Sequence, residues 1–139
     1  MNVLETEWWS LALPPEWWAE AEEDSILVGD RDEVGCIEIS TLHKEDGEFD
    51  PAQMREIAGE ESASVRDWRK VSLGDFEGVT GSFVEEGAAI REWYVMHKRT
   101  MLFITYSCDE DNRGMDDAAV DELLDTLLFL EREAQGLPM

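Results

Sequence analysis

The sequence has 139 residues, of which 43% are hydrophobic and 9% aromatic, so a wholly disordered chain is excluded and one domain spanning residues 1–139 is predicted. Thirty-four acidic residues against eleven basic ones give a formal net charge of −23. Because nucleic acids and anionic membranes are themselves negatively charged, we expect neither DNA, RNA nor a membrane as a partner.

The N-terminal segment does not have the features of a secretory signal. No Lys or Arg precedes its apolar run, and no small-x-small cleavage site follows it. No stretch approaches the roughly 20 apolar residues of a membrane helix, so we expect a cytoplasmic protein. Cys36 and Cys108 are too few for a disulfide framework and too far apart in sequence for a C-x-x-C site. We expect both to be buried free thiols.

The first strand is predicted over residues 8–13, and a proline turn leads to a second strand at residues 16–18. Each strand carries two adjacent tryptophans, whose side chains point to opposite faces of an extended chain. One member of each pair is therefore free to face a partner, and we select Trp9 and Trp18 as candidate partner contacts. Tryptophan also commonly covers the rim of a core, which is the structural alternative for both residues.

An acidic segment follows, interrupted by a short apolar run at residues 26–28 and a turn-forming stretch at residues 29–32. This pattern predicts a short strand and a hairpin turn. The next strand, residues 34–42, alternates apolar and polar side chains and is expected to be half-buried.

The clearest local signal in the sequence is a helix start near residue 50. Asp50 can cap the helix, Pro51 suits its first position and Gln53 can close a capping box, while Phe49 can pack against Met54. The apolar stripe is narrow, so we expect a short helix that ends near residue 62 and covers one face of a sheet.

Four further strands are predicted, at residues 65–73, at 79–85 and as a pair within 88–108 that turns at Lys98 and Arg99. Because the connections are two to five residues long, the four strands form an antiparallel meander. The turn pairs Tyr94 with Phe103 and Met96 with Met101 on one face, and Trp93 with Ile104 and Val95 with Leu102 on the other. Both faces are apolar, so helices, a second sheet or a partner must cover each of them.

A closing helix is predicted from the helical spacing of four apolar residues: Val120, Leu123, Leu124 and Leu127. Asp116 and Asp117 suit its first turn because the helix dipole favours negative charge there. Residues 128–130 are apolar all round, so the chain is expected to leave the helix and lie against the core. The tail from residue 131 is expected to be loose.

Three of these features resemble a known fold family. They are the strand, proline turn and tryptophan of residues 11–17 (LALPPEW), the single early helix before a run of antiparallel strands, and the closing helix that ends in residues 127–130 (LLFL). Together they resemble the PsbP-like family, which includes a photosystem II extrinsic subunit, a Ran-binding import factor and bacterial secretion-effector chaperones. The resemblance implies an α+β fold, an antiparallel meander sheet flanked by helices in an α/β/α sandwich. It also implies an interaction role, and it transfers no functional residues.

Two acidic loops invite a calcium hypothesis, which the spacing does not support. In residues 109–114, Arg113 occupies a ligand position and Val120 stands where a bidentate Glu is required. Residues 30–35 fail similarly, because Val34 and Thr41 fall at ligand positions. We therefore expect solvated loops, no metal site and no cofactor.

No sequence motif for catalysis is present. The chain has no G-x-S-x-G, H-E-x-x-H, Walker or dinucleotide motif, and only two histidines, His43 and His97, to serve as a base for a cysteine. We therefore expect a protein that is not an enzyme.

The leading hypothesis is an acidic protein-binding module, for example an immunity protein or a chaperone for a secreted bacterial effector, with a basic protein as partner. Its candidate partner contacts are Trp9, Trp18, Asp30, Asp32, Asp109, Glu110 and Asp111. The alternative is a small-molecule-binding domain or an unrecognised enzyme with a cleft beside the sheet, which four aromatic residues could line: Trp93, Tyr94, Phe103 and Tyr106.

Overall fold

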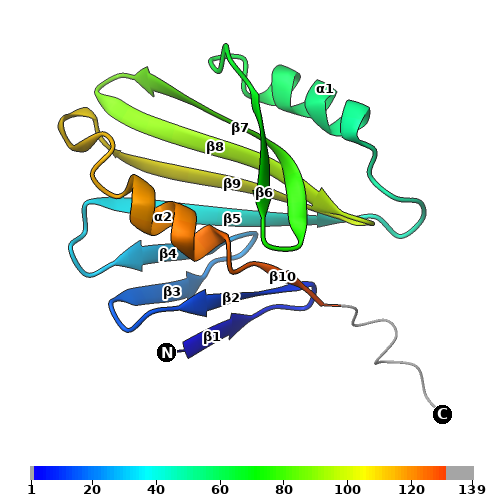
Figure 1. Ribbon diagram of the computed structural model, residues 1–139, viewed down its shortest axis with the longest axis horizontal. Coiled ribbons are helices and arrows are strands. Elements are labelled where there is room, and N and C mark those ends of the chain that lie inside the picture. The colour runs from blue at the N-terminus through cyan, green and yellow to red at the C-terminus, as the bar shows by residue number, and fades with distance from the viewer. Residues whose placement is uncertain (1, 131–139) are drawn as a thin grey trace.

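The computed structural model describes residues 2–130, which form two antiparallel sheets and two α-helices (Figure 1). The large sheet has the strand order β3-β4-β5-β9-β8-β7-β6 and the small sheet the order β1-β2-β10. The large sheet contains β3 (Trp17–Ala21), β4 (Ile26–Asp30), β5 (Gly35–His43), β6 (Arg69–Leu73), β7 (Phe76–Glu85), β8 (Ala88–His97) and β9 (Thr100–Asp109). The small sheet contains β1 (Asn2–Glu5), β2 (Trp9–Leu13) and β10 (Leu128–Phe129), and the helices are α1 (Pro51–Glu61), η1 (Glu110–Asn112, a 3-10 turn) and α2 (Asp117–Leu124).

The two faces of the large sheet are covered by different elements. We call the face that carries Trp93, Val95, Leu102 and Ile104 the closed face, because these residues share one core cluster with β2 and α2. In Figure 1, α2 crosses in front of the large sheet. We call the opposite face, which carries Tyr94, Met96, Met101 and Phe103, the open face; these residues cluster with Met54 and Ala58 of α1. The predicted fold class, an α+β sandwich with helices on both sides of an antiparallel sheet, is confirmed.

The central hairpin has the predicted register. β8 and β9 turn at Lys98 and Arg99, and all four predicted pairs are present, from Trp93 with Ile104 to Met96 with Met101. Lys98 adopts a positive φ of 54°, which is the left-handed conformation that a tight hairpin turn requires. Strands β6 to β9 are neighbours in chain order, so the predicted four-strand meander is also confirmed.

Helix α1 begins where the capping signal predicts. The Asp50 carboxylate accepts hydrogen bonds from the backbone N–H groups of Ala52 (2.7 Å) and Gln53 (3.3 Å), and Pro51 is the first helical residue. Gln53 does not close the predicted capping box, because its side chain instead accepts a hydrogen bond from Lys44 Nζ at 3.0 Å. The Asp50 side chain alone therefore caps the first turn.

The strand predicted at residues 65–73 begins only at Arg69. Val65 and Trp68 lie in the preceding loop, yet both side chains pack on the open face: Val65 lies over Gly81, and Trp68 makes an edge contact with Tyr94 at 5.7 Å. A loop that carries buried apolar residues has the same local composition as a strand, which explains the difference. The turn between β6 and β7 is also tighter than predicted, since β7 begins at Phe76 rather than at residue 79.

The small sheet joins segments from opposite ends of the sequence, and only part of it was predicted. β1 has no counterpart among the predicted strands, whereas the prediction that the chain leaves the last helix and lies against the core is confirmed. Leu128 and Phe129 pair with Ser10 and Trp9, and the Phe129 N–H donates to the Asp75 carboxylate at 3.0 Å. The predicted loose tail from residue 131 lies outside the described residues.

Candidate functional site

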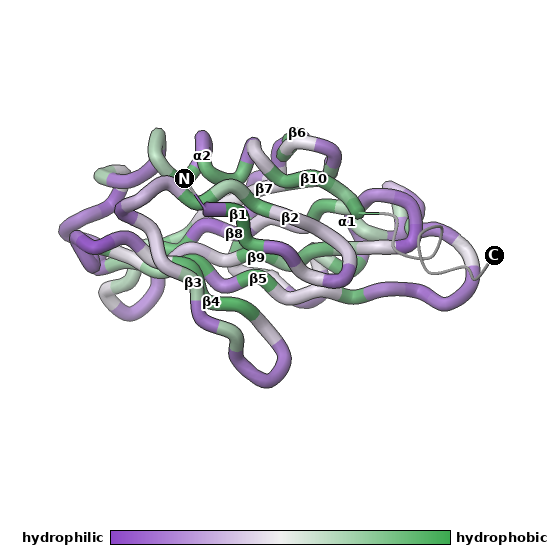
Figure 2. The backbone as a smooth tube through the Cα atoms, turned by 90° about the horizontal axis from the view of Figure 1, so that it is seen from below, coloured by the Kyte–Doolittle hydropathy of each residue, from purple (hydrophilic) through white to green (hydrophobic). Residues whose placement is uncertain are grey.

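Six of the seven candidate contacts lie along one end of the large sheet, although they are far apart in sequence. The register places Trp17 opposite Asp30 and Gly35 opposite Cys108, so β3 begins, β4 ends, β5 begins and β9 ends on the same side (left in Figure 1). We call this set the acidic end: Trp18, Asp30, Asp32, Asp109, Glu110 and Asp111. From β3 to β9 it spans three strand spacings, roughly 14 Å. The loops at this end are mostly hydrophilic (Figure 2).

Trp18 is the aromatic side chain of the acidic end. It is 40% exposed and lies on the open face over Gly29. A Cβ at Gly29 would lie only 2.3 Å from the Trp18 ring, so the glycine is what allows the indole to lie against β4. An indole held in this way is an exposed aromatic surface of fixed orientation.

The charges of the acidic end continue into the start of α2. The pKa of Asp116 is raised by burial and by the nearby carboxylates of Asp32, Asp30 and Asp117. The Tyr106 hydroxyl donates a hydrogen bond to Asp116 Oδ2 at 3.1 Å, and burial together with this carboxylate raises the tyrosine pKa. Carboxylates from two separate segments, residues 30–32 and 116–117, are thus close enough to repel one another, and a positively charged partner would relieve that repulsion.

Trp9 does not belong to this surface, and its selection as an exposed contact is wrong. The residue is fully buried, and its indole N–H donates to Thr41 Oγ1 at 2.8 Å. The face of β2 that carries Trp9, Leu11 and Leu13 is buried against the large sheet. Trp8 is the half-buried member of the pair, and its ring stacks on His43 with 3.6 Å between centroids. Alternation alone could not determine which tryptophan faces inward.

The carboxylates of the acidic loops accept hydrogen bonds from backbone N–H groups of the same loops rather than surrounding a metal position. Asp109 Oδ1 accepts the N–H of Asp111 at 2.9 Å, and Asp32 Oδ1 accepts the N–H of Val34 at 3.0 Å. Within residues 2–130, no group of three or more His, Cys, Asp or Glu side chains is placed to hold a metal ion.

The two cysteines differ in exposure. Cys108 is a buried free thiol, as predicted, whereas Cys36 is only half-buried. Burial, followed by the nearby Glu38 carboxylate, raises the pKa of the Cys36 thiol. A raised pKa lowers the thiolate fraction at neutral pH and therefore the nucleophilicity of this side chain.

The four aromatic residues proposed to line a cleft do not share one. Trp93 and Tyr106 are buried on the closed face, while Tyr94 and Phe103 stack on each other, at 4.7 Å between ring centroids, on the open face. Tyr94 is further fixed by a hydrogen bond of 2.8 Å with Ser62. These side chains belong to the two cores, so the prediction that they line one cleft is wrong.

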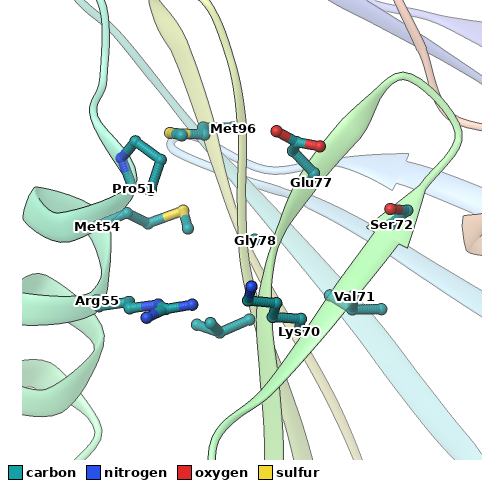
Figure 3. Close-up of a pocket in the computed structure, with 10 residues that line it drawn as sticks. Pro51, Met54, Arg55, Lys70, Val71, Ser72, Glu77, Gly78 and Met96 are labelled. Atoms are coloured by element: carbon teal, nitrogen blue, oxygen red, sulfur yellow. The ribbon is translucent and has the colours of Figure 1, made fainter.

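A groove that was not predicted lies elsewhere, between α1 and the β6–β7 hairpin (Figure 3). It encloses about 380 Å³, and its walls and floor come from ten residues: Pro51, Met54, Arg55, Lys70, Val71, Ser72, Glu77, Gly78, Val79 and Met96. We call it the α1 groove. In sequence its residues are scattered over four elements, so only the packing of α1 across the sheet brings them together.

None of the helices within residues 2–130 has the length and apolar character needed to cross a lipid bilayer. No protein-family model matches the sequence, and no curated protein matches it.

Solved structures share the fold. A crystal structure from Bacteroides thetaiotaomicron matches 91% of this chain with a TM-score of 0.66 and 19% identity, and the match covers 46% of that protein, so this chain spans about half its length. LpqN of Mycobacterium tuberculosis, described as involved in cell envelope biogenesis, matches over 87% of this chain and 82% of its own, with a TM-score of 0.58 and 16% identity. At these identities the likeness concerns the fold.

A solution structure of cyanobacterial PsbP from Synechocystis is also among the matches. It covers 89% of this chain and 88% of its own, with 10% identity and a TM-score of 0.45.

Proposed function

We propose that the protein is a non-enzymatic binding module that recognises a basic protein through the acidic end. The observation that carries the proposal is the convergence of five carboxylates and the exposed Trp18 on one end of the large sheet. A concentrated negative potential steers a positively charged partner and raises its association rate, while an aromatic side chain held against the sheet supplies contact area at low entropic cost.

The partner class follows from the same chemistry. A basic partner would bring Lys or Arg side chains to carboxylates that otherwise repel one another, and an apolar patch beside them would cover Trp18. A secreted, basic bacterial effector has this character, so an immunity protein or an effector chaperone in the cytoplasm is the specific role we propose. The absence of catalytic motifs in the sequence is consistent with a role in binding.

The test uses the protein as bait in native lysate, with quantitative recovery at low and high salt. The acidic-end variant Asp32→Asn/Glu110→Gln/Asp111→Asn is compared with a control variant, Glu56→Gln/Glu60→Gln/Glu61→Gln, that neutralises three exposed acids of α1. Both have a formal net charge of about −20. Only the acidic-end variant should lose a basic partner, and its association rate should fall several-fold at low salt and converge with that of the wild type at high salt.

Trp18→Ala tests the aromatic contact separately. We expect about tenfold faster dissociation with little change in the association rate, because an uncharged anchor acts after encounter. Equal losses in the acidic-end and α1 variants, or a recovered partner that is acidic, would contradict the proposal.

A further inference from the structure

The α1 groove has an apolar floor and two positively charged walls. Met54 of α1, Val79 of β7 and Met96 of β8 form the floor and belong to one core cluster. Arg55 reaches from α1 toward the strands, and Lys70 lies on the opposite wall (Figure 3). Gly78 also lines the groove, and no side chain fits at this position because a Cβ would lie 1.9 Å from the Tyr94 carbonyl oxygen and 2.8 Å from the Met54 Cε atom.

In the described part of the chain, the two cations of the groove are not paired with carboxylates. Within residues 2–130, neither Arg55 nor Lys70 forms an ion pair, although acidic residues outnumber basic ones about threefold. Residues 51–73 contain four basic and four acidic side chains, so the whole charge of −23 is carried by the remainder of the chain. Six of the ten residues that line the groove belong to this neutral segment: Pro51, Met54, Arg55, Lys70, Val71 and Ser72.

We infer that the α1 groove binds a small monocarboxylate with an apolar body. The carboxylate lies between the Arg55 guanidinium and the Lys70 ammonium, and the apolar part covers Met54, Val79 and Met96. Guanidinium and carboxylate are geometrically matched for paired hydrogen bonds, and methionine side chains adapt to irregular apolar ligands. This site is separate from the acidic end and does not depend on the function proposed for it.

The size and charge of the groove restrict the ligand. About 380 Å³ is near the lower limit of small-molecule pockets, which favours a compact ligand over a long lipid. Glu77 also lines the groove, so two cations and one anion leave a net charge of one, which suits a monoanion better than a doubly charged phosphate.

The experiment titrates octanoate into the full chain labelled with ¹³C at the methionine methyl groups. We expect saturable shifts of Met54 and Met96, which line the groove, and none of Met115, which is 65% exposed near the acidic end. Octylammonium should not bind, and both octanol and octyl phosphate should bind about tenfold more weakly, because each lacks the matched single negative charge.

Two variants and one control test the residues. Arg55→Gln/Lys70→Gln should lower octanoate affinity about tenfold, while Arg66→Gln/Arg69→Gln, which makes the same charge change on residues that do not line the groove, should keep wild-type affinity. Ser72→Trp, at an exposed strand position, should block the groove without unfolding the protein. Equal binding of octanoate and octylammonium, shifts that include Met115, or equal affinity loss in the control would overturn the inference; tighter binding of octyl phosphate would overturn its choice of ligand.

Discussion

The two faces of the large sheet share the same strands but differ in how completely they are covered. Nineteen buried residues form the core on the closed face, where α2 and the small sheet both contribute, against seven in the core beneath α1 on the open face. Trp18 and Leu42 are exposed on the open face, at 40% and 53%. The closed face holds the fold together, whereas the exposed tryptophan and the α1 groove, which carry the two proposals, lie on the face that is covered less.

The largest expected effect is the loss of a closed-face side chain. Trp93 is 1% exposed, and the Arg91 guanidinium lies 4.6 Å from its ring centroid. Trp93→Ala should lower the free energy of unfolding by about 3–5 kcal/mol, through lost burial and the cavity that remains. Chemical denaturation measures this change. Trp18→Ala serves as the control and should cost less than about 1.5 kcal/mol, since the residue is partly in water.

A smaller loss is expected beneath α1. Met54 is 2% exposed and joins α1 to the open face, so Met54→Ala should cost about 2 kcal/mol, at the low end for a buried methionine because the adjacent groove already interrupts the packing. Met115→Ala, at an exposed position, should change stability by less than about 0.5 kcal/mol. If Met54→Ala proves as costly as Trp93→Ala, the two faces contribute equally and the distinction between them fails.

Glu92 offers a test of opposite sign. It is 8% exposed on the open face, and its Oε1 atom has no hydrogen-bond partner within residues 2–130. A buried polar atom in this state is costly, so Glu92→Met should stabilise the protein by about 1 kcal/mol. Thermal unfolding measures the gain, and Glu85→Met at an exposed position of β7 is the control. A destabilised Glu92→Met variant would mean that this carboxylate has a favourable role.

The smallest expected effect depends on pH. The pKa of Asp116 is raised in the folded protein, so the folded state favours the neutral carboxyl group. The contribution of Asp116 to the free energy of folding is therefore fully present below the pKa of the unfolded state and is lost as pH rises through the pKa of the folded state. Asp116→Asn should therefore raise the melting temperature at pH 7, by the equivalent of about 0.5 kcal/mol. The amide oxygen can still accept the Tyr106 hydrogen bond. The advantage should vanish as pH falls below about 4, and an advantage that persists there would exclude an electrostatic origin.

The sequence alone predicted those parts of the fold that depend on neighbouring residues in the chain. The turn at Lys98 and Arg99 fixes the pairing of Trp93 with Ile104 because side chains alternate with period two, and the cap at Asp50 fixes the start of α1 because few residues satisfy its exposed N–H groups. The carboxylates of the acidic end were identified from the turn-like composition of their segments, although Asp30 is the half-buried last residue of β4.

What could not be predicted depends on contacts between distant segments. Trp9 faces inward only because β2 packs on the large sheet, and a two-residue strand such as β10 has no periodicity to detect. The convergence of Asp32 with Asp109 follows from the strand order, and the pairing of Arg55 with Lys70 across a groove follows from the position of α1. The clustering of four of the eleven basic residues within residues 51–73 is the sequence signal that could have indicated the groove.

The small sheet also determines the order in which the chain can fold. β2 pairs with β10 across more than a hundred residues, and β2 brings Trp9 and Leu11 to the closed face. During synthesis from the N-terminus, β2 therefore remains without this neighbour until β10 emerges, while the local hairpins of the large sheet can form earlier. Until then β2 presents an apolar strand with an unpaired edge, so the nascent chain passes through a stage in which it is most exposed to self-association.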